Sequence, residues 1–581
     1  MCGIAGILSF KNKVEIDSLL KMTNAIAHRG PDGGGHWINN AASVGFGHRR
    51  LSIIDLSDKA SQPMHYAGGR FSITYNGEIY NYIELKEDLQ KKGYTFISGS
   101  DTEVLLALYQ FKGEKCLEEL DGMFAFAIWD EQEKTLFCAR DRFGEKPFYY
   151  NYEPGDHFFF ASEMKALWAN GVSRENDDFV VSHYLATGNV MYEPDTTRTF
   201  YKKIKQLDAS HYLTIKNSSL NIVKYFDIDP TRKNKTINEK EAAEQFRDLL
   251  ENSVRLRLRS DVPVGSSLSG GMDSSSIVLL IDKLKGQTNT QNTFSARFKD
   301  YAKDEGKYIE KVVKAGKNIK PHETWPDGDQ LTQELQKLIY HQEEPFSSAS
   351  MFAQWKVMEL AKKENVTVLL DGQGADEYLA GYLPYYNLYL KQLYFTDKKK
   401  YNNEWNDFFD LRNVKIDRFE EQETLQMKAG RLKRKLLNQP MPYDDNSLGK
   451  ELKRSSLHFG LKELLRYADR NAMAHSREVR LPFLSHKLIE FAFSLPDNYK
   501  LRNGWTKWVL RKSMEDILPA DICWRIDKIG YEPPQKKWLE DNEDLKKQVR
   551  NGREKFHQLT KSRDASVSDW ACIMIENYLG N

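Results

Sequence analysis

The chain lacks an excess of either charge and lacks any long apolar run. Its 581 residues carry 84 Lys and Arg against 83 Asp and Glu, so a net charge of +1 creates no overall field that favours a polyanion. The longest apolar stretches, such as residues 123–129, are seven or eight residues long, whereas a membrane span needs about 18–20. We therefore expect neither nucleic acid nor a membrane as a partner.

The chain also has few cysteines, and they show no pairing pattern. The five are Cys2, Cys116, Cys138, Cys523 and Cys572. An odd, scattered set without a CxxC pair fits neither a disulfide framework nor a structural zinc site. The opening MCGIAGILSF has no basic segment before its apolar stretch, unlike a secretory signal. These features predict a cytoplasmic protein.

The composition that is present predicts folded domains. A content of 40% hydrophobic and 12% aromatic residues is enough for packed cores, and the length predicts more than one domain. Up to about residue 215 the pattern indicates short strands, with a helix from Asp101, whose carboxylate is expected to cap it. The predicted strands are residues 4–8, 71–75, 123–129, 136–139 and 158–161. This half is therefore predicted to be α+β.

A polar stretch without periodicity, residues 216–238, predicts a linker between domains at 1–215 and 239–581. In the second domain, helix-like and strand-like segments alternate, which favours a parallel sheet with helices on its faces. The predicted strands are 262–268, 293–298 and 366–370, and the predicted helices are 239–258, 305–315 and one from Ser274. Beyond Tyr378 the pattern is mostly helical, which predicts a helical addition.

Cys2 is the first candidate for chemistry. Removal of the initiator Met would leave a thiol beside its own α-amine, whose pKa of about 7.7–8.0 suits a base. Nucleophile and base would then belong to one residue. A buried cysteine that acts only as a small apolar side chain is the alternative.

Two further motifs follow predicted strands. SGGMDSS, residues 269–275, stands between a strand and a helix, where its backbone N–H groups could bind a pyrophosphate and Asp273 could hold Mg²⁺. DGQGADE, residues 371–377, follows another strand at the edge where open α/β sheets bind ligands. A generic glycine turn and a solvated acidic turn are the alternatives for each motif alone. A Walker loop is excluded, because no Gly-Lys pair is followed by Ser or Thr.

Taken together and in this order, the motifs resemble those of two-domain, glutamine-dependent asparagine synthetases. The resemblance covers nearly the whole chain. The motifs are MCGIAGI (1–7), HRGPD (28–32), HRRLSIID (48–55), QPM (62–64), NGEIYN (76–81), SDTE (100–103), GMFAFA (122–127), RDRFGEKP (140–147), FASEMKAL (160–167), the two loops above and EVRLPFL (478–484).

The resemblance implies an N-terminal glutaminase of the N-terminal-nucleophile (αββα) fold. The Cys2 thiolate would attack the glutamine amide, and Asn76 with the Gly77 N–H would form the oxyanion hole. Arg50 would hold the glutamine α-carboxylate, while the acids Glu78 and Asp101 would hold its α-ammonium. The alternative roles for these three residues are surface ion pairs and helix caps. Their roles follow from matching motif positions.

For the C-terminal half the resemblance implies an α/β ATP-pyrophosphatase fold with helical additions. ATP would adenylate a carboxylate, and ammonia from glutamine, delivered through an internal channel, would displace AMP. The implied ATP-binding residues are Leu268, Ser269, Gly270, Gly271, Asp273, Ser274, Ala296, Asp371 and Gly372. Asp273 and Asp376 would bind Mg²⁺, and Lys528 would neutralise charge on the phosphates, with a surface lysine as its alternative.

Three positions depart from the family pattern. Gln373 stands where a carboxylate is common, and an amide cannot accept a proton. Ser485 replaces a usual Asp, and Asp371 stands where Ser is commoner. The leading hypothesis is asparagine synthesis from aspartate, ATP and glutamine, by a protein that the family implies is a homodimer. The alternatives are the same chemistry on another carboxylate, such as a uronic acid, and a scaffold that has kept only the fold.

Overall fold

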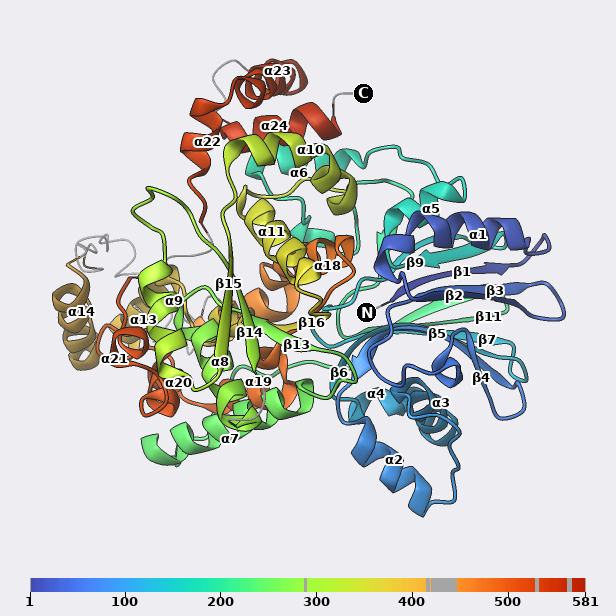
Figure 1. Cartoon of the computed structure of the whole chain (residues 1–581), viewed down its shortest axis with the longest axis horizontal. Coiled ribbons are helices and arrows are strands. Elements are labelled where there is room, and N and C mark those ends of the chain that lie inside the picture. Colours follow the sequence, from blue (N-terminus) through green and yellow to red (C-terminus); the bar gives the residue numbers. More distant parts are fainter. Residues whose placement is uncertain are drawn as a thin grey trace, which may run out of the picture.

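Two stacked antiparallel sheets form the first half of the protein, with helices on their outer faces (Figure 1). One sheet contains β1 (Gly3–Ser9), β2 (Gly33–Ile38), β3 (Val44–Arg50), β8 (Tyr149–Glu153), β9 (His157–Ala161) and β10 (Lys205–Gln206). The other contains β4 (Met64–Tyr66), β5 (Phe71–Ile79), β6 (Gly122–Asp130), β7 (Thr135–Arg140), β11 (His211–Lys216) and β12 (Ser219–Lys224). Their orders are β10-β8-β9-β1-β3-β2 and β12-β11-β7-β6-β5-β4.

Apolar side chains fill the space between the two sheets. Phe46 and Phe160 from the first sheet share a core cluster with Trp129 and Leu213 from the second. The outer helices are α1 (Ile16–Ala25) and α5 (Met164–Ala169) on the first sheet, and α2 (Tyr82–Lys91), α3 (Asp101–Lys112) and α4 (Cys116–Glu119) on the second, while α6 (Asp178–Thr187) follows in the chain. The predicted αββα architecture is confirmed.

Two sequence-based expectations need correction here. Strand β12 falls within the expected linker at residues 216–238, but it pairs along its whole length with β11 and so belongs to the sheet. The first domain's sheet therefore continues to Lys224, and only the chain after it connects the two halves. Helix α3 is capped by the Ser100 side chain, which accepts from the N–H of Thr102, and not by Asp101.

A five-stranded parallel sheet lies at the centre of the second half. Its strands are β13 (Val264–Ser267), β14 (Gln291–Ala296), β15 (Ile319–Thr324), β16 (Val368–Leu370) and β17 (Glu478–Arg480), in the order β15-β14-β13-β16-β17. The chain moves outward from β13 to β15 and then returns to the other side of β13. The ends of β13 and β16 therefore form a topological switch point, where such sheets bind ligands.

Helices cover this sheet and extend beyond it (Figure 1). The helices up to the end of α12 are α7 (Glu239–Arg257), α8 (Met272–Lys285), α9 (Gly306–Ala315), α10 (Gly328–Gln342), α11 (Ser350–Lys363) and α12 (Ala375–Tyr378). The later ones are α13 (Leu383–Thr396), α14 (Lys398–Arg412), α17 (Leu448–Lys453), α18 (Leu461–Ala474), α19 (His486–Ser494), α20 (Trp508–Met514), α21 (Ala520–Cys523), α22 (Gln535–Asp541), α23 (Glu543–Thr560) and α24 (Asp569–Tyr578). The predicted helical addition is confirmed, although β17 interrupts it.

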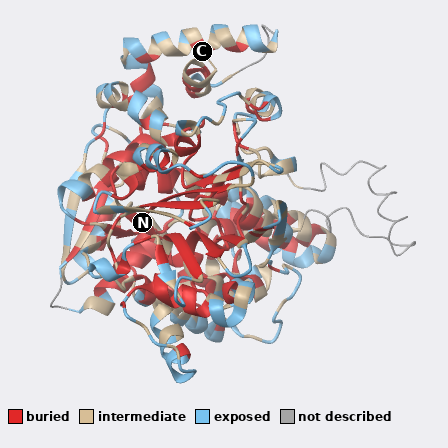
Figure 2. Ribbon diagram, turned by 90° about the vertical axis from the view of Figure 1, so that its right-hand side faces the viewer, coloured by how far each residue is buried: buried red, intermediate tan, exposed pale blue. Residues whose placement is uncertain are grey.

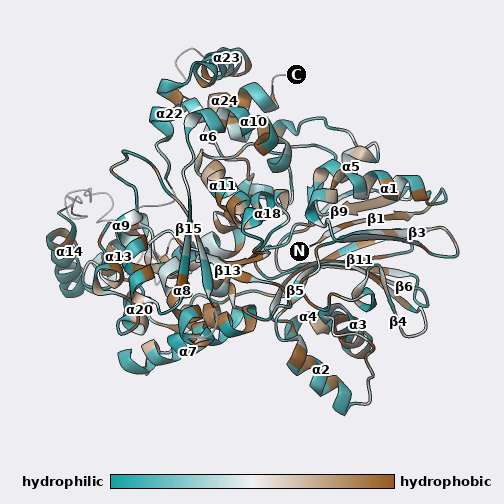
Figure 3. Cartoon of the chain, in the orientation of Figure 1, coloured by the Kyte–Doolittle hydropathy of each residue, from teal (hydrophilic) through white to brown (hydrophobic). Residues whose placement is uncertain are grey.

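The structure is a computed structural model that describes residues 2–286, 290–413, 418, 447–527, 532–561 and 567–579. Lys528 lies outside these residues. Buried residues are concentrated in the three sheets and the helices next to them (Figure 2). Outer helices such as α7 and α23 are largely hydrophilic (Figure 3). In the described part of the chain, no helix combines the length and apolar character that a membrane crossing requires.

Candidate active sites

Cys2 lies where the two antiparallel sheets meet, one residue before β1. Only 9% of the residue is exposed, and its backbone nitrogen donates to Oδ1 of Asn76 at 2.9 Å. Its Sγ lies 3.9 Å from the carbonyl oxygen of Leu51. Asn76 belongs to β5 of the second sheet, so the stacking of the sheets brings the two residues together.

The amide nitrogen of Asn76 is free to bind something else. Asn76 is fully buried, and its Nδ2 has no hydrogen-bond partner among the described residues. A buried donor without a partner is costly in a folded protein unless a ligand or water binds it. At Gly77, a Cβ atom would lie 2.2 Å from the carbonyl oxygen of Met123. The site therefore has an amide donor on a side chain that contacts Cys2 and a backbone that admits no side chain at residue 77.

Burial of Cys2 disfavours the thiolate. Burial raises the pKa of the Cys2 thiol, while the N-terminal amino group lowers it and the carboxylates of Glu78 and Glu478 raise it. With Met1 attached, the Cys2 nitrogen is a peptide N–H and has no basic lone pair. Loss of Met1 would convert it into an α-amine that can take the thiol proton.

Two of the three expected glutamine-binding residues, Arg50 and Asp101, are held by hydrogen bonds within the first half of the protein. Arg50 ends β3 and donates to the carbonyl oxygens of Ser57 at 2.9 Å and Asp55 at 2.5 Å. Asp101 is buried, and its Oδ2 accepts from the hydroxyl of Tyr75 at 2.8 Å and from a backbone N–H. These contacts hold both side chains in fixed orientations.

Glu78 has a neighbour from the other half of the protein. Burial raises the pKa of Glu78 well above its usual range, and the nearby Glu478 raises it further. A guanidinium nitrogen of Arg480 lies 3.6 Å from Glu78. Glu478 and Arg480 form part of β17, so a strand of the second half lies next to the site around Cys2. Both residues belong to the motif EVRLPFL, for which the sequence indicated no role.

The second site lies at the switch point of the parallel sheet. β13 and β16 are hydrogen-bonded neighbours, and the two glycine-rich loops follow them directly. A Cβ atom at Gly372 would lie 2.6 Å from the backbone nitrogen of Ser274 and 2.8 Å from the carbonyl carbon of Asp273. The two loops are therefore in close backbone contact, and glycine at residue 372 permits this approach.

The first loop leads into the 14-residue helix α8. Gly270 has a φ of +76°, a left-handed conformation that glycine adopts without strain. The hydroxyls of Ser269 and Ser274 are 3.0 Å apart across the loop. A glycine turn at the start of a helix presents backbone N–H groups and the positive end of the helix dipole to an anion.

A cavity of about 690 Å³ opens above both loops. Its lining includes Ser269, Gly271, Asp273, Ser274, Asp371, Gly372, Gln373 and Asp376 among the expected residues. Gly270, Leu268 and Ala296 are not in its lining. Leu268 is 1% exposed and donates its N–H to the carbonyl of Phe294, behind the loop.

Lys507 connects the two expected metal ligands. Its Nζ lies 2.5 Å from Asp273 and 2.6 Å from Asp376, and its side chain is 5% exposed. Burial alone would lower the pKa of Lys507, but the two carboxylates raise it above its usual value. Two carboxylates that converge on one cation are a donor set that fits Mg²⁺. Lys507 stands outside both loop motifs, so the sequence contained no signal for it.

A second cavity of about 310 Å³ shares Asp371 and Gln373 with the first. Oδ1 of Asp371 accepts from the N–H of Gln373 at 3.2 Å, while Oε1 of Gln373 has no partner among the described residues. The rest of its lining is Ser267, Ser347, Ser348, Ser350, Met351, Gln354, Val357, Leu464 and Tyr467. Ser485 is buried at the start of α19 and lines neither cavity.

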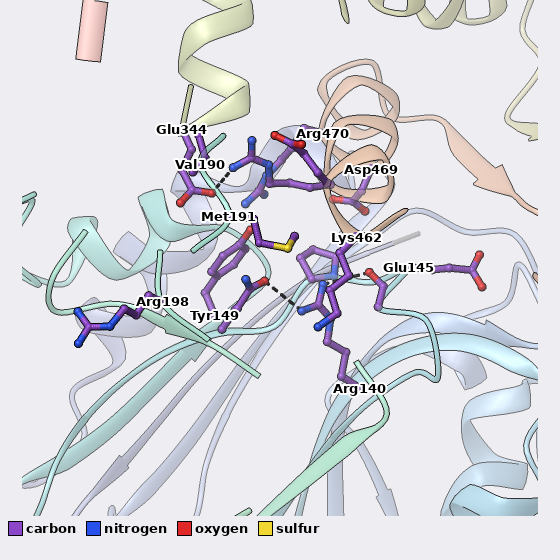
Figure 4. A pocket seen from close by; sticks show the side chains of 15 residues that line it. Arg140, Glu145, Tyr149, Val190, Met191, Arg198, Glu344, Lys462, Asp469 and Arg470 are labelled. Atoms are coloured by element: carbon purple, nitrogen blue, oxygen red, sulfur yellow. Dashed lines mark hydrogen bonds and ion pairs between the residues drawn. The ribbon is translucent and has the colours of Figure 1, made fainter. Parts of the chain in front are cut away.

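A small cavity lined by charged side chains from both halves lies at the interface between them (Figure 4). Arg140, Glu145 and Tyr149 come from the first half, and Lys462, Asp469 and Arg470 from helix α18 of the second. Burial raises the pKa of Glu145 to about 8. Burial of this many charges fixes the halves relative to each other through specific ion pairs.

Two family models match consecutive parts of the chain. Residues 1–226 match the model of the glutamine amidotransferase domain, and residues 245–563 match that of asparagine synthase. The chain belongs to the asparagine synthase family. Asparagine synthetase [glutamine-hydrolyzing] 1 of Bacillus subtilis is 32% identical, over 95% of this chain and 89% of that protein.

Two further proteins are similar to most of the chain. Asparagine synthetase [glutamine-hydrolyzing] 3 of the same organism is 32% identical over 90% of this chain and 86% of its own length. A protein named amidase chry2 of Gibberella zeae is 27% identical over 93% of this chain and 90% of its own length. Among solved structures, the PRPP amidotransferase of Bacillus subtilis has a TM-score of 0.31 at 16% identity, covering 64% of this chain and 81% of its own.

Proposed function

We propose that the protein is a glutamine-hydrolysing asparagine synthetase. Family membership supports this proposal, and the relatives named above include asparagine synthetases that match nearly the whole chain. The observation that carries it is the presence of two sites in one chain. One combines Cys2 with an unpartnered amide donor, and the other combines two strand-end loops around a cavity.

At the first site, removal of Met1 would free the α-amine of Cys2 to accept the thiol proton. The thiolate attacks the glutamine amide carbon, and Nδ2 of Asn76 with the N–H of Gly77 binds the oxyanion. Collapse of this intermediate releases ammonia and leaves a thioester, which water hydrolyses to glutamate. Arg50 binds the glutamine α-carboxylate, and Glu78 with Asp101 binds its α-ammonium.

At the second site, the N–H groups of loop 269–274 bind the β- and γ-phosphates of ATP. Asp273 and Asp376 would hold Mg²⁺, which would supply positive charge beside the phosphates. Lys507, and Lys528 from outside the described residues, add positive charge there. The acceptor carboxylate attacks the α-phosphorus and expels pyrophosphate, and ammonia then displaces AMP from the acyl carbon. An internal channel between the two sites would deliver this ammonia.

A different acceptor carboxylate is the second candidate, supported by the second cavity. None of the described residues that line it is Lys, Arg or His. The first N–H groups of α11 also have partners, since that of Ala349 donates to Gln535 and that of Ser350 to Ser348. If the acceptor occupies this cavity, the α-carboxylate of aspartate finds little positive charge there. A uronic acid, with one carboxylate and several hydroxyls, avoids this problem.

The test is pyrophosphate release from ATP and Mg²⁺ with ammonium, comparing aspartate with a panel of uronic acids. Release with aspartate supports the first candidate, and release only with a uronic acid supports the second. Cys2→Ala should abolish the use of glutamine and retain that of ammonium, because only the first site needs the thiol. Glutamine hydrolysis by Cys2→Ala would refute the assigned nucleophile. We further propose a cytoplasmic location and a homodimer.

A further inference from the structure

Helix α18 approaches the backbone of Cys2 through one arginine. Asp469 on this helix accepts hydrogen bonds from both terminal nitrogens of Arg29, at 2.8 and 3.0 Å. The third nitrogen of the same guanidinium, Nε, donates to the carbonyl oxygen of Cys2 at 3.0 Å. A single planar side chain therefore connects the second half of the protein to the nucleophile in the first.

The geometry of this pair determines where Nε of Arg29 points. A guanidinium that binds a carboxylate through two parallel hydrogen bonds is fixed in direction as well as in position. The side chains of Arg29 and Asp469 are 0% and 3% exposed, so water cannot replace either partner. Glu163 also accepts from Arg29, at 2.8 Å, and this third contact holds the guanidinium from the first half.

The residues that follow Asp469 on α18 fix this part of the helix to neighbouring segments. Arg470 donates to Glu343 at 2.6 Å, and Glu343 in turn accepts the backbone N–H groups of Met164 and Lys165. The side chain of Asn471 donates to the carbonyl oxygen of Met351, which lines the second cavity. Asp469 and Arg470 lie together at the cavity between the two halves (Figure 4).

We propose that Asp469 is a positioning residue for glutamine hydrolysis. It orients Arg29, which holds the carbonyl of Cys2 and thereby aligns the thiol with Nδ2 of Asn76. Asp469 touches neither glutamine nor ATP and acts only through Arg29. This inference rests on the proposed role of Cys2 as the nucleophile.

The test compares two variants of the full-length enzyme. Asp469→Asn removes the charge and one acceptor from the Arg29 pair. Asp208→Asn is the matched control, because Asp208 pairs with Lys462 of the same helix at 2.8 Å across the same interface but does not contact Cys2. We expect Asp469→Asn to lower kcat for glutamine hydrolysis by roughly 10- to 100-fold, since small misplacements of reacting groups have effects of this size. KM for glutamine and ammonium-dependent pyrophosphate release should stay unchanged.

Two further measurements distinguish positioning from loss of the fold. Asp469→Glu retains the charge but moves the carboxylate, so it should also lower kcat while ammonium-dependent release continues. The double variant Arg29→Lys, Asp469→Asn should have a kcat only slightly below that of Asp469→Asn, because both substitutions disrupt the same Arg29–Asp469 pair. The proposal would be overturned if both Asp469 variants hydrolysed glutamine at the wild-type kcat. It would also be overturned if Asp208→Asn lowered this kcat as much as Asp469→Asn does. A wild-type enzyme without glutaminase activity would instead refute the proposed function.

Discussion

Replacement of Asn76 tests whether its Nδ2 is the donor that binds the oxyanion during glutamine hydrolysis. Oδ1 of Asn76 accepts from the backbone nitrogen of Cys2, whereas the buried Nδ2 has no partner among the described residues. If Nδ2 binds the oxyanion, Asn76→Ala removes one donor that acts only once charge develops. Loss of one such donor typically lowers kcat about 10²–10³-fold, or roughly 3–4 kcal/mol of transition-state stabilisation.

Asn76→Asp separates this donor from the other contact of the side chain. Aspartate has nearly the same shape and can still accept from Cys2, but it offers no N–H and adds charge beside Glu78. We therefore expect a loss of kcat at least as large as that of Asn76→Ala. If Asn76 served only to accept the hydrogen bond from the Cys2 nitrogen, Asn76→Asp would instead leave kcat nearly unchanged.

The assay is glutamate formation from glutamine, with ammonium-dependent pyrophosphate release as the measure of folded enzyme. Asn151→Ala is a matched control, because Asn151 is 6% exposed and hydrogen-bonded at both ends, to Lys203 and His157, without contacting Cys2. It should leave glutamine hydrolysis intact. Wild-type kcat in Asn76→Asp would refute the oxyanion assignment.

Three other substitutions test the rest of the account. Lys507→Gln removes a buried cation from the ATP cavity and should lower pyrophosphate release about 10²-fold with either nitrogen source, and a wild-type rate would contradict its role. Gly372→Ala places a Cβ 2.6 Å from the nitrogen of Ser274, so the loops must separate and KM for ATP should rise while glutamine hydrolysis continues; an unchanged KM would contradict the contact. Burial raises the pKa of Glu145 from 4.5 to about 8, so folding loses stability as the pH rises between these values. Glu145→Gln should remove this loss of folding stability, which amounts to up to about 5 kcal/mol. The Tm of the variant should therefore exceed that of the wild type by more at pH 8 than at pH 5. An equal difference in Tm at both pH values would refute the raised pKa of Glu145.

Much of both sites could be predicted from the sequence because their motifs are local. Cys2 lies at the chain start, and the loops at 269–275 and 371–377 each follow a short apolar strand. A loop at the end of a parallel strand lies at one edge of the sheet whatever the remaining topology. The sequence therefore predicts that the two loops lie close together. In the structure the backbone of Gly372 packs directly against that of Ser274.

Contacts between distant segments could not be predicted in this way. Arg29 and Asp469 are 440 residues apart, and neither has a pattern that indicates its partner. Strand β17 has only three residues within a helical region, so periodicity cannot detect it, yet it brings Glu478 to the glutaminase site. The sequence pattern indicated Asp101 as the cap of α3, one residue after the observed cap Ser100, because both Ser and Asp are good helix caps.

The most direct test of the central claim follows the nitrogen atom. The enzyme is incubated with glutamine labelled with ¹⁵N in its amide, together with ATP, Mg²⁺ and aspartate, and product amide and pyrophosphate are quantified. The account predicts ¹⁵N-labelled asparagine and pyrophosphate in equal amounts, with neither formed from glutamine by Cys2→Ala. Labelled ammonia and glutamate without a labelled amide on aspartate would contradict asparagine synthesis from glutamine in this protein.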